Sequence, residues 1–251
     1  MMRSRELARA GSAWLAVVVA VTACTTVERK PVAAATHEFR IHASDYMFQS
    51  QDTIVAGLTT ITLDNGGPAL HHVQLVRLEG GKTLADLQAA LKKPGLPPDW
   101  AVFIPGPNAV DAQQTSNLTI DLAAGNYAII CAVDVPGATP HFARGMVKEL
   151  TVIPGTGAAA SAPTADVTMV LSDYSFTLST PLTAGHHVIE VMNKGPQPHE
   201  VLIVRFEPGK TFDDLARWMA KPSGPPPAHA EGGATFEPAG MSATIAVDFS
   251  P

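Results

Sequence analysis

Short apolar runs separated by turn residues make up most of residues 37 to 154. The runs read HEFRIHASDYMF, TTITLDN, HHVQLVRL, NLTIDL, YAIICAV and GMVKELTV. Each is alternating or continuously apolar and is bounded by Gly, Pro, Asn or Asp, which is the pattern of β-strands joined by turns. Many short strands at such spacing predict an all-β sandwich or barrel.

Two segments have helical periodicity instead. Leu84, Leu87 and Leu91 recur at intervals of three and four residues, and Thr83 stands where an N-cap belongs. The same pattern follows Thr211 in the run FDDLARWMAK. The sequence therefore predicts one helix after each threonine, and the leucines of the first helix are expected to pack on the strands.

The chain repeats itself at an offset of 128 residues. SDYMF from Ser44 matches SDYSF from Ser172, and NGGPALHHVQLVRLEGGKT from Asn65 matches NKGPQPHEVLIVRFEPGKT from Asn193. We interpret the two stretches as copies of one structural unit. Each copy is expected to fold as a sandwich with one inserted helix.

The repeat sets the expected domain boundaries. The first copy covers residues 37–154 and the second covers 166–251, and the segment GTGAAASAPTA, residues 155–165, is expected to be a linker. The second copy stops at Pro251, where the first copy is about to enter Gly125. We therefore expect the second sandwich to be incomplete at its C-terminus and the sequence to be a fragment of a longer chain.

Composition narrows the function. The chain is 46% hydrophobic and 16% charged, which indicates a folded protein, and its net charge is −6. It has no Lys/Arg cluster beyond its first residues. Binding to nucleic acid requires a basic surface, so we expect no nucleic-acid partner.

Residues 1–24 have the pattern of an export signal, with arginines before the apolar run AWLAVVVAVTA. The segment Val21–Cys24 resembles the lipobox of bacterial lipoproteins, which implies a lipid on Cys24, a tether over residues 25–36 and a membrane-anchored protein on the periplasmic side of the cell envelope. The alternative is an ordinary signal peptide cleaved after Ala23. Either interpretation predicts an exported protein.

Export changes the meaning of the cysteines, because Cys24 and Cys131 are the only two. If Cys24 carries lipid, Cys131 has no disulfide partner. A free thiol in an oxidising compartment is a liability unless it is buried or bound to metal. A Cys24–Cys131 disulfide remains an open alternative.

A cysteine, a histidine and a methionine follow one another in YAIICAVDVPGATPHFARGM. With a histidine from an early strand, this order resembles the cupredoxin superfamily, the plastocyanin-like blue-copper sandwiches. The resemblance covers residues 37–154 fully and 166–251 partly. It implies Greek-key β-sandwiches and one mononuclear type 1-like copper in the first copy, with the ligands His71, Cys131, His141 and Met146.

Two questions about this ligand set can be answered only by the three-dimensional structure. His71 and His72 would point to opposite sides of a strand, and we favour His71 because it matches His199 in the repeat, with His72 as the fallback. Nine residues separate Cys131 from His141, more than in familiar blue-copper sites. The longer loop either returns His141 to the site or leaves it in solvent.

Other residues receive structural interpretations. Tyr46 and Tyr174, in the repeated Ser-Asp-Tyr, are expected to pack in the sandwiches with hydrogen-bonded hydroxyls. Surface or turn positions are expected for five histidines, namely His37, His42, His186, His187 and His229.

Three functions follow from these patterns. The first is a lipid-anchored copper protein that transfers electrons to a redox partner protein or handles copper, and the second is a metal-free cupredoxin-like binding or scaffold module. The third, a copper oxidase or nitrite reductase, would need His-x-His pairs, which the chain lacks. Because four protein ligands leave no open position on the metal, we expect that the protein is not an enzyme. The second copy is expected to bind no metal.

Overall fold

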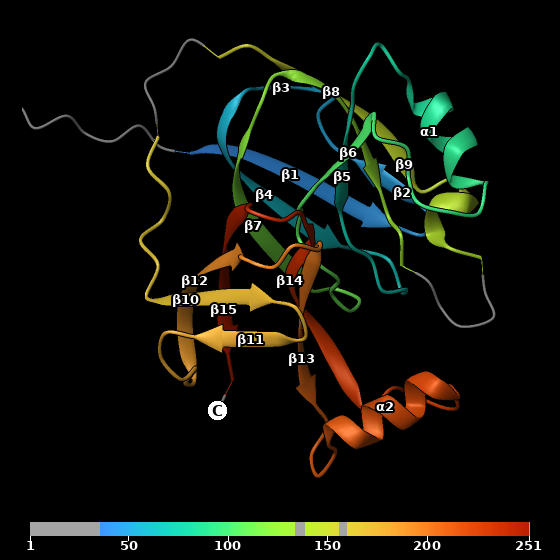
Figure 1. The fold of residues 1–251 in the computed structure, drawn as a ribbon. Helices are drawn as coiled ribbons and strands as arrows, with labels where there is room; N and C mark the ends of the chain where they lie inside the picture. The colour runs from blue at the N-terminus through green and yellow to red at the C-terminus, as the bar shows by residue number, and fades with distance from the viewer. Residues whose placement is uncertain (1–35, 134–138, 156–159, 251) are drawn as a thin grey trace, which may run out of the picture. The chain divides into compact units, whose positions relative to one another are not determined.

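The computed structural model describes residues 36–133, 139–155 and 160–250, and these residues are mostly β-strand (Figure 1). Cys24, the leader over residues 1–24 and most of the predicted tether lie outside the described residues, as do residues 156–159 of the predicted linker. In the described part of the chain, no helix is long and apolar enough to cross a membrane.

Two sheets form the first copy. The strands of one sheet that belong to this copy are β1 (His37–Ser44), β2 (Met47–Gln49), β4 (Gly57–Asn65) and β7 (Thr115–Leu122), in the order β7-β4-β1-β2. The other sheet has the order β3-β9-β8-β5-β6, with β3 (Thr53–Val55), β5 (Gln74–Leu78), β6 (Ala101–Ile104), β8 (Gly125–Ile130) and β9 (Val147–Ile153).

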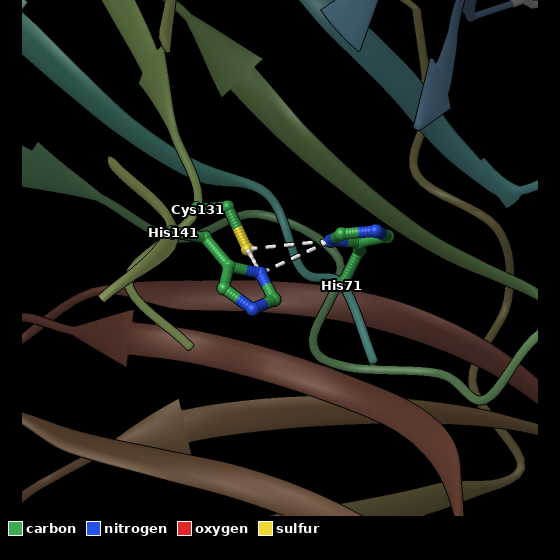
Figure 2. A group of neighbouring side chains, drawn as sticks. All are labelled: His71, Cys131 and His141. Atoms are coloured by element: carbon green, nitrogen blue, oxygen red, sulfur yellow. Dashed lines mark hydrogen bonds between the residues drawn. The ribbon is translucent and has the colours of Figure 1, made fainter. Parts of the chain in front are cut away.

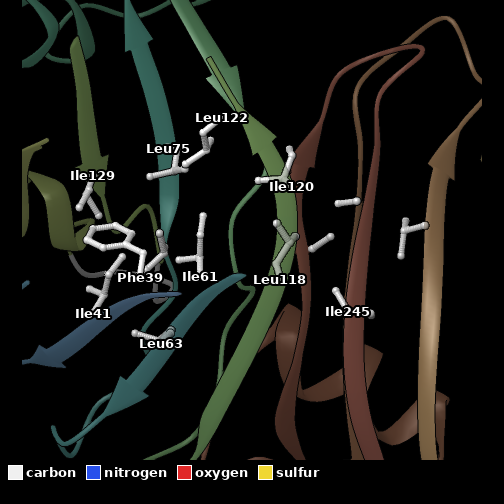
Figure 3. Packing of buried hydrophobic residues seen from close by; sticks show 14 of the residues in the cluster. Phe39, Ile41, Ile61, Leu63, Leu75, Leu118, Ile120, Leu122, Ile129 and Ile245 are labelled. Atoms are coloured by element: carbon white, nitrogen blue, oxygen red, sulfur yellow. The ribbon is translucent and has the colours of Figure 1, made fainter. Parts of the chain in front are cut away.

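The apolar core includes buried residues from both sheets (Figure 3). Phe39 and Ile61 come from β1 and β4, and Leu75 and Ile129 come from β5 and β8. Buried residues alternate with exposed or half-buried ones along β1 and β4, as expected for strands with one face on a core. The predicted all-β sandwich with Greek-key character is confirmed.

The second copy repeats part of this arrangement. Its strands are β10 (Val167–Ser172), β11 (Ser175–Leu178), β12 (Gly185–Asn193), β13 (His199–Phe206), β14 (Ala228–Glu237) and β15 (Ser242–Phe249). Within residues 160–250 no strand corresponds to β8 or β9 of the first copy. Side chains at equivalent positions therefore differ in solvent exposure. Phe48 is 5% exposed in the first copy, whereas Phe176, at the same position in the second copy, is 64% exposed.

The two predicted helices are present. Helix α1 (Leu84–Leu91) and helix α2 (Phe212–Ala220) begin after Thr83 and Thr211, and each threonine forms a capping box with an aspartate three residues later. In α1 the buried Leu87 packs with strand residues of β5 and β8, and the half-buried Leu84 and Leu91 flank it. The expected apolar face of this helix is confirmed.

One sheet continues from the first copy into the second, which the sequence does not reveal. Strands β7 and β15 pair through Thr119 and Thr244, and this joins four strands of each copy in an eight-stranded sheet. The Asn117 side chain adds two hydrogen bonds to the backbone of Ala246, both 3.0 Å long. The domain boundaries drawn at residues 155–165 stay a prediction.

Candidate metal centre

Three side chains from distant parts of the first copy converge on one point (Figure 2). His71 Nδ1 lies 3.2 Å from His141 Nδ1, and Cys131 Sγ lies 3.5 Å from His141 Nδ1 and 3.9 Å from His71 Nδ1. His71 and Cys131 are 0% exposed and His141 is 4% exposed. A thiol and two imidazole nitrogens thus face one another in a buried site.

The ends of two paired strands position Cys131. Strand β8 ends at Ile130, β9 begins at Val147, and the two strands are antiparallel neighbours. Cys131 continues this pairing, because its backbone N–H donates to the carbonyl of Met146 over 3.2 Å. Cys131 therefore lies at the end of the sheet where the chain leaves β8 and later enters β9.

A short helix returns His141 to this sheet end. The 3₁₀-helix η1 (His141–Arg144) follows Pro140, and the N–H of Phe142 donates to the carbonyl of Cys131 over 2.7 Å. Gly145 ends the helix at a φ of 101°, a left-handed conformation that glycine adopts without strain. Despite the nine-residue interval, the chain brings His141 back beside Cys131.

His71 lies in an isolated bridge and not in a long strand. It pairs with Val110, whereas β5 begins at Gln74. The predicted strand HHVQLVRL is therefore wrong over its first residues. The reason is that the N–H of Val73 donates to the carbonyl of Pro107, outside the ladder that β5 forms with β6.

The neighbouring His72 is not part of the cluster. Its Nε2 accepts a hydrogen bond from the backbone N–H of Ala132 over 2.6 Å. Burial lowers the pKa of His72 to about 4, so its imidazole is neutral. The structure brings His71, and not the fallback His72, together with Cys131 and His141.

The backbone of Met146 is hydrogen-bonded to two residues of the cluster, His141 and Cys131. Met146 is 0% exposed, and its backbone N–H donates to the carbonyl of His141 over 3.1 Å. Together with its bond to Cys131, this places Met146 at the junction of the loop and β9. The converging nitrogen and sulfur atoms are those of His71, Cys131 and His141.

Asp45 fixes the orientation of the His71 ring. His71 Nε2 lies 2.8 Å from Asp45 Oδ1, and a carboxylate accepts the hydrogen bond, so Nε2 carries the proton. The lone pair of Nδ1 then points toward Cys131 and His141. Histidines that bind metal usually donate their other ring N–H to such a partner.

A glycine makes room for this pair. A side chain at Gly67 would place its Cβ 2.7 Å from Asp45 Oδ1 and 3.0 Å from His71 Nε2. The second copy has the same arrangement, with His199 Nε2 2.9 Å from Asp173 Oδ1 and Gly195 beneath them. The repeated glycine therefore follows from the close approach of chain and ring.

Asn65 organises the turn that leads to His71. Its side-chain amide donates to the carbonyls of Ala69 and Val110, and its Oδ1 accepts from the N–H of Gly67. Sequence reasoning missed Asp45, Asn65 and Gly67 as parts of the site. Their signal was present, because all three recur at the same offset in the second copy.

Burial controls the charge of the cluster. It raises the pKa of the Cys131 thiol to about 11, and burial together with the nearby His71 lowers the pKa of His141. Without a cation, the site therefore holds a protonated thiol. A bound metal would take the place of that proton, because the thiolate is the form that binds metal.

The donor set fits copper. Soft sulfur with two imidazole nitrogens, in a buried site whose ligand atoms lie within 4.8 Å of one another, is the combination that copper sites use. It is also the only group of three such donors in the described residues. Three of the four ligands that the resemblance implies, His71, Cys131 and His141, lie in this cluster.

His37 is exposed, as expected. Four histidines at half-buried or exposed positions pair with carboxylates, namely His42, His186, His187 and His229. Tyr46 packs against the core and against His141. The expectation that Tyr174 packs in a sandwich is wrong, since it is 97% exposed and the described second copy has no counterpart of η1 to cover it.

Comparisons with known proteins give distant likenesses only. No protein-family model and no curated protein matches the chain. Among solved structures, auracyanin A from Chloroflexus aurantiacus, a "blue" copper protein, is 24% identical over 47% of this chain and all of its own, with a TM-score of 0.34. A copper-containing nitrite reductase from Thermus scotoductus is 13% identical over 86% of this chain and 56% of its own, with a TM-score of 0.30.

A third similar structure is a blue copper oxidase from Nitrosomonas europaea, 14% identical over 86% of this chain and 76% of its own, with a TM-score of 0.30. The strand order, the repeat and the His-Cys-His cluster agree with a cupredoxin-like fold. The expectation that the protein is not an enzyme is wrong, because the similar structures include copper enzymes. The expectation rested on four protein ligands that leave no open position on one metal ion. Such a ligand set keeps substrate away from that ion only and does not restrict the rest of the molecule.

Proposed function

We propose that the first copy binds one copper ion, which His71, Cys131, His141 and Met146 would hold. The proposal rests on one observation. The sulfur of Cys131 and the Nδ1 atoms of His71 and His141 lie 3.2 to 3.9 Å from one another in a buried site. Bound copper would supply single-electron redox chemistry. The protein would therefore carry electrons to and from a redox partner protein, or handle copper.

Each residue has a distinct role in this proposal. Cys131 supplies the thiolate, and the apolar residues around it keep water away from the site. Asp45 holds the proton on His71 Nε2, so that Nδ1 is free to bind. His141 enters from η1 and completes the set.

We propose that this site works outside the cytoplasm. The support is the leader over residues 1–24 with its lipobox-like end at Cys24, which would place the protein on the membrane of the cell envelope through a lipid. A buried free thiol in the described structure fits that setting, because Cys131 has no disulfide there.

Copper titration of the purified full chain tests the proposal. We expect one tightly bound copper per chain and an intense thiolate-to-copper absorption band that saturates at one equivalent. A metal-free binding or scaffold module would instead lose all copper on dialysis and show no such band. The second copy is expected to add no further equivalent, because its described residues offer no group of three metal-binding side chains.

Asp45→Ala is expected to weaken copper binding by about 10- to 100-fold, the usual effect of removing the partner of a ligand histidine. The cause is that His71 Nε2 loses its acceptor and the ring loses its fixed orientation. Competition titration against a chelator of known affinity measures this change. Asp173→Ala is the matched control, since it removes the same contact from His199 in the second copy. An equal loss in both variants would contradict the assignment.

A further inference from the structure

We propose that Tyr46 and Arg144 form a clamp that holds η1, and with it His141, in the position for metal binding. Both are positioning residues. The inference rests on the proposed copper site for its purpose, but the clamp itself is a property of the metal-free chain.

The first half of the clamp is a ring contact. The rings of Tyr46 and His141 meet edge to face, with centroids 4.8 Å apart and planes at 71°. Tyr46 also stands perpendicular to His71, at 6.4 Å. One tyrosine, from the turn between β1 and β2, therefore borders both imidazoles.

Arg144 supplies the second half. Its guanidinium carbon lies 4.8 Å from the centroid of the Tyr46 ring, and its Nη1 donates a hydrogen bond to the Tyr46 hydroxyl. A cation over an aromatic face is attracted by the ring's electron density. Since His141 and Arg144 are the first and last residues of η1, Tyr46 touches this helix at both ends.

The clamp answers a need created by the long loop. Nine residues separate Cys131 from His141, and a longer loop costs more entropy to hold in one conformation. Among the described residues, the backbone N–H of His141 donates to the carbonyl of Val133 and that of Phe142 donates to the carbonyl of Cys131. Two contacts to Tyr46 tie this loop to the opposite sheet of the sandwich.

The second copy provides an internal comparison. It keeps Asp173 against His199 at 2.9 Å, as Asp45 stands against His71 at 2.8 Å. Its tyrosine, Tyr174, is nevertheless 97% exposed, whereas Tyr46 is half-buried. The Asp-Tyr pair therefore has two separable functions, because the aspartate serves the early histidine in both copies and the tyrosine packs only where η1 is present.

Tyr46→Leu tests the clamp in the full chain, with Tyr174→Leu as the matched control. In metal-free protein we expect the amides of His141 and Met146 to exchange with deuterium at least about 10-fold faster in Tyr46→Leu, because the loop opens locally more often. We expect its copper affinity to fall by about 10-fold or more and its thiolate-to-copper band to shift. Tyr174→Leu should behave like the unaltered protein in all three measurements.

Two further variants separate the contacts. Tyr46→Phe keeps the ring against His141 and loses the hydroxyl, so we expect an intermediate exchange rate. Arg144→Gln changes an exposed residue and should raise exchange at His141 even if Tyr46→Leu fails to fold. Unchanged exchange at His141 in Arg144→Gln and in any folded Tyr46 variant would overturn the clamp, as would an equal effect of Tyr174→Leu. If the unaltered protein binds no copper, the proposed function fails, while the exchange measurements still decide the clamp.

Discussion

Cys131→Ser is expected to abolish the thiolate-to-copper absorption band and to lower copper affinity by more than about 100-fold, beyond the effect of losing a ligand's partner. The hydroxyl is a hard donor that does not ionise near neutral pH, so the two imidazoles lose the soft ligand that selects copper. Absorption and competition titration measure both effects.

The other cysteine provides the control for this experiment. Cys24→Ser removes the second thiol of the chain and should leave the band and the copper affinity unchanged. If the band persisted in Cys131→Ser and disappeared in Cys24→Ser, the thiolate ligand would be Cys24, and the proposed site would be contradicted.

Glu237→Gln is expected to remove a strong pH dependence from the stability of the second copy. Glu237 is 0% exposed, neither of its carboxylate oxygens has a hydrogen-bond partner in the described structure, and burial raises its pKa to about 8. It pairs with His199 as Val110 pairs with His71 in the first copy. A carboxyl group therefore occupies a place that an apolar side chain holds in the first copy.

The sign of this effect follows from proton linkage. The folded chain keeps the proton that the unfolded chain releases near a pKa of ~4.3, so folding is favoured at low pH and this advantage is lost as pH rises toward 8. Between pH 5 and pH 8 the free energy of unfolding should fall by roughly 3 kcal/mol more in the unaltered protein than in Glu237→Gln. Urea unfolding at several pH values measures the difference.

An exposed acid serves as the control for Glu237. Glu38→Gln, on the solvent side of β1, should follow the pH dependence of the unaltered protein. Parallel stability curves for Glu237→Gln and the unaltered protein would show that Glu237 is not held in its neutral form.

Much of the fold could be predicted because its signals are local. Alternation along β1 and β4 and the N-caps Thr83 and Thr211 depend on neighbouring residues, and the repeat transfers the prediction of strands and of a capped helix to the second copy. The joining of β7 to β15 could not be predicted. It depends on one residue pair and one asparagine side chain, and no periodicity indicates which strand edges meet.

The candidate site divides in the same way. Order and residue type selected Cys131 and His141, and the repeat favoured His71 over His72. The structure brings these three side chains together. The role of Asp45 depends on a contact with a residue 26 positions away, although its repetition beside His199 was a usable signal. Tyr174 misled for the opposite reason, since the same tripeptide packs in one copy and is exposed in the other.

Crystals of the copper-loaded full chain, measured at the copper absorption edge, test the central claim most directly. Anomalous scattering locates the ion independently of any assumption about its ligands. We expect one strong peak in the first copy, within bonding distance of Cys131 Sγ and of Nδ1 of both His71 and His141. A peak at His72 or at the carboxylate-paired surface histidines, with none at Cys131, would contradict the account.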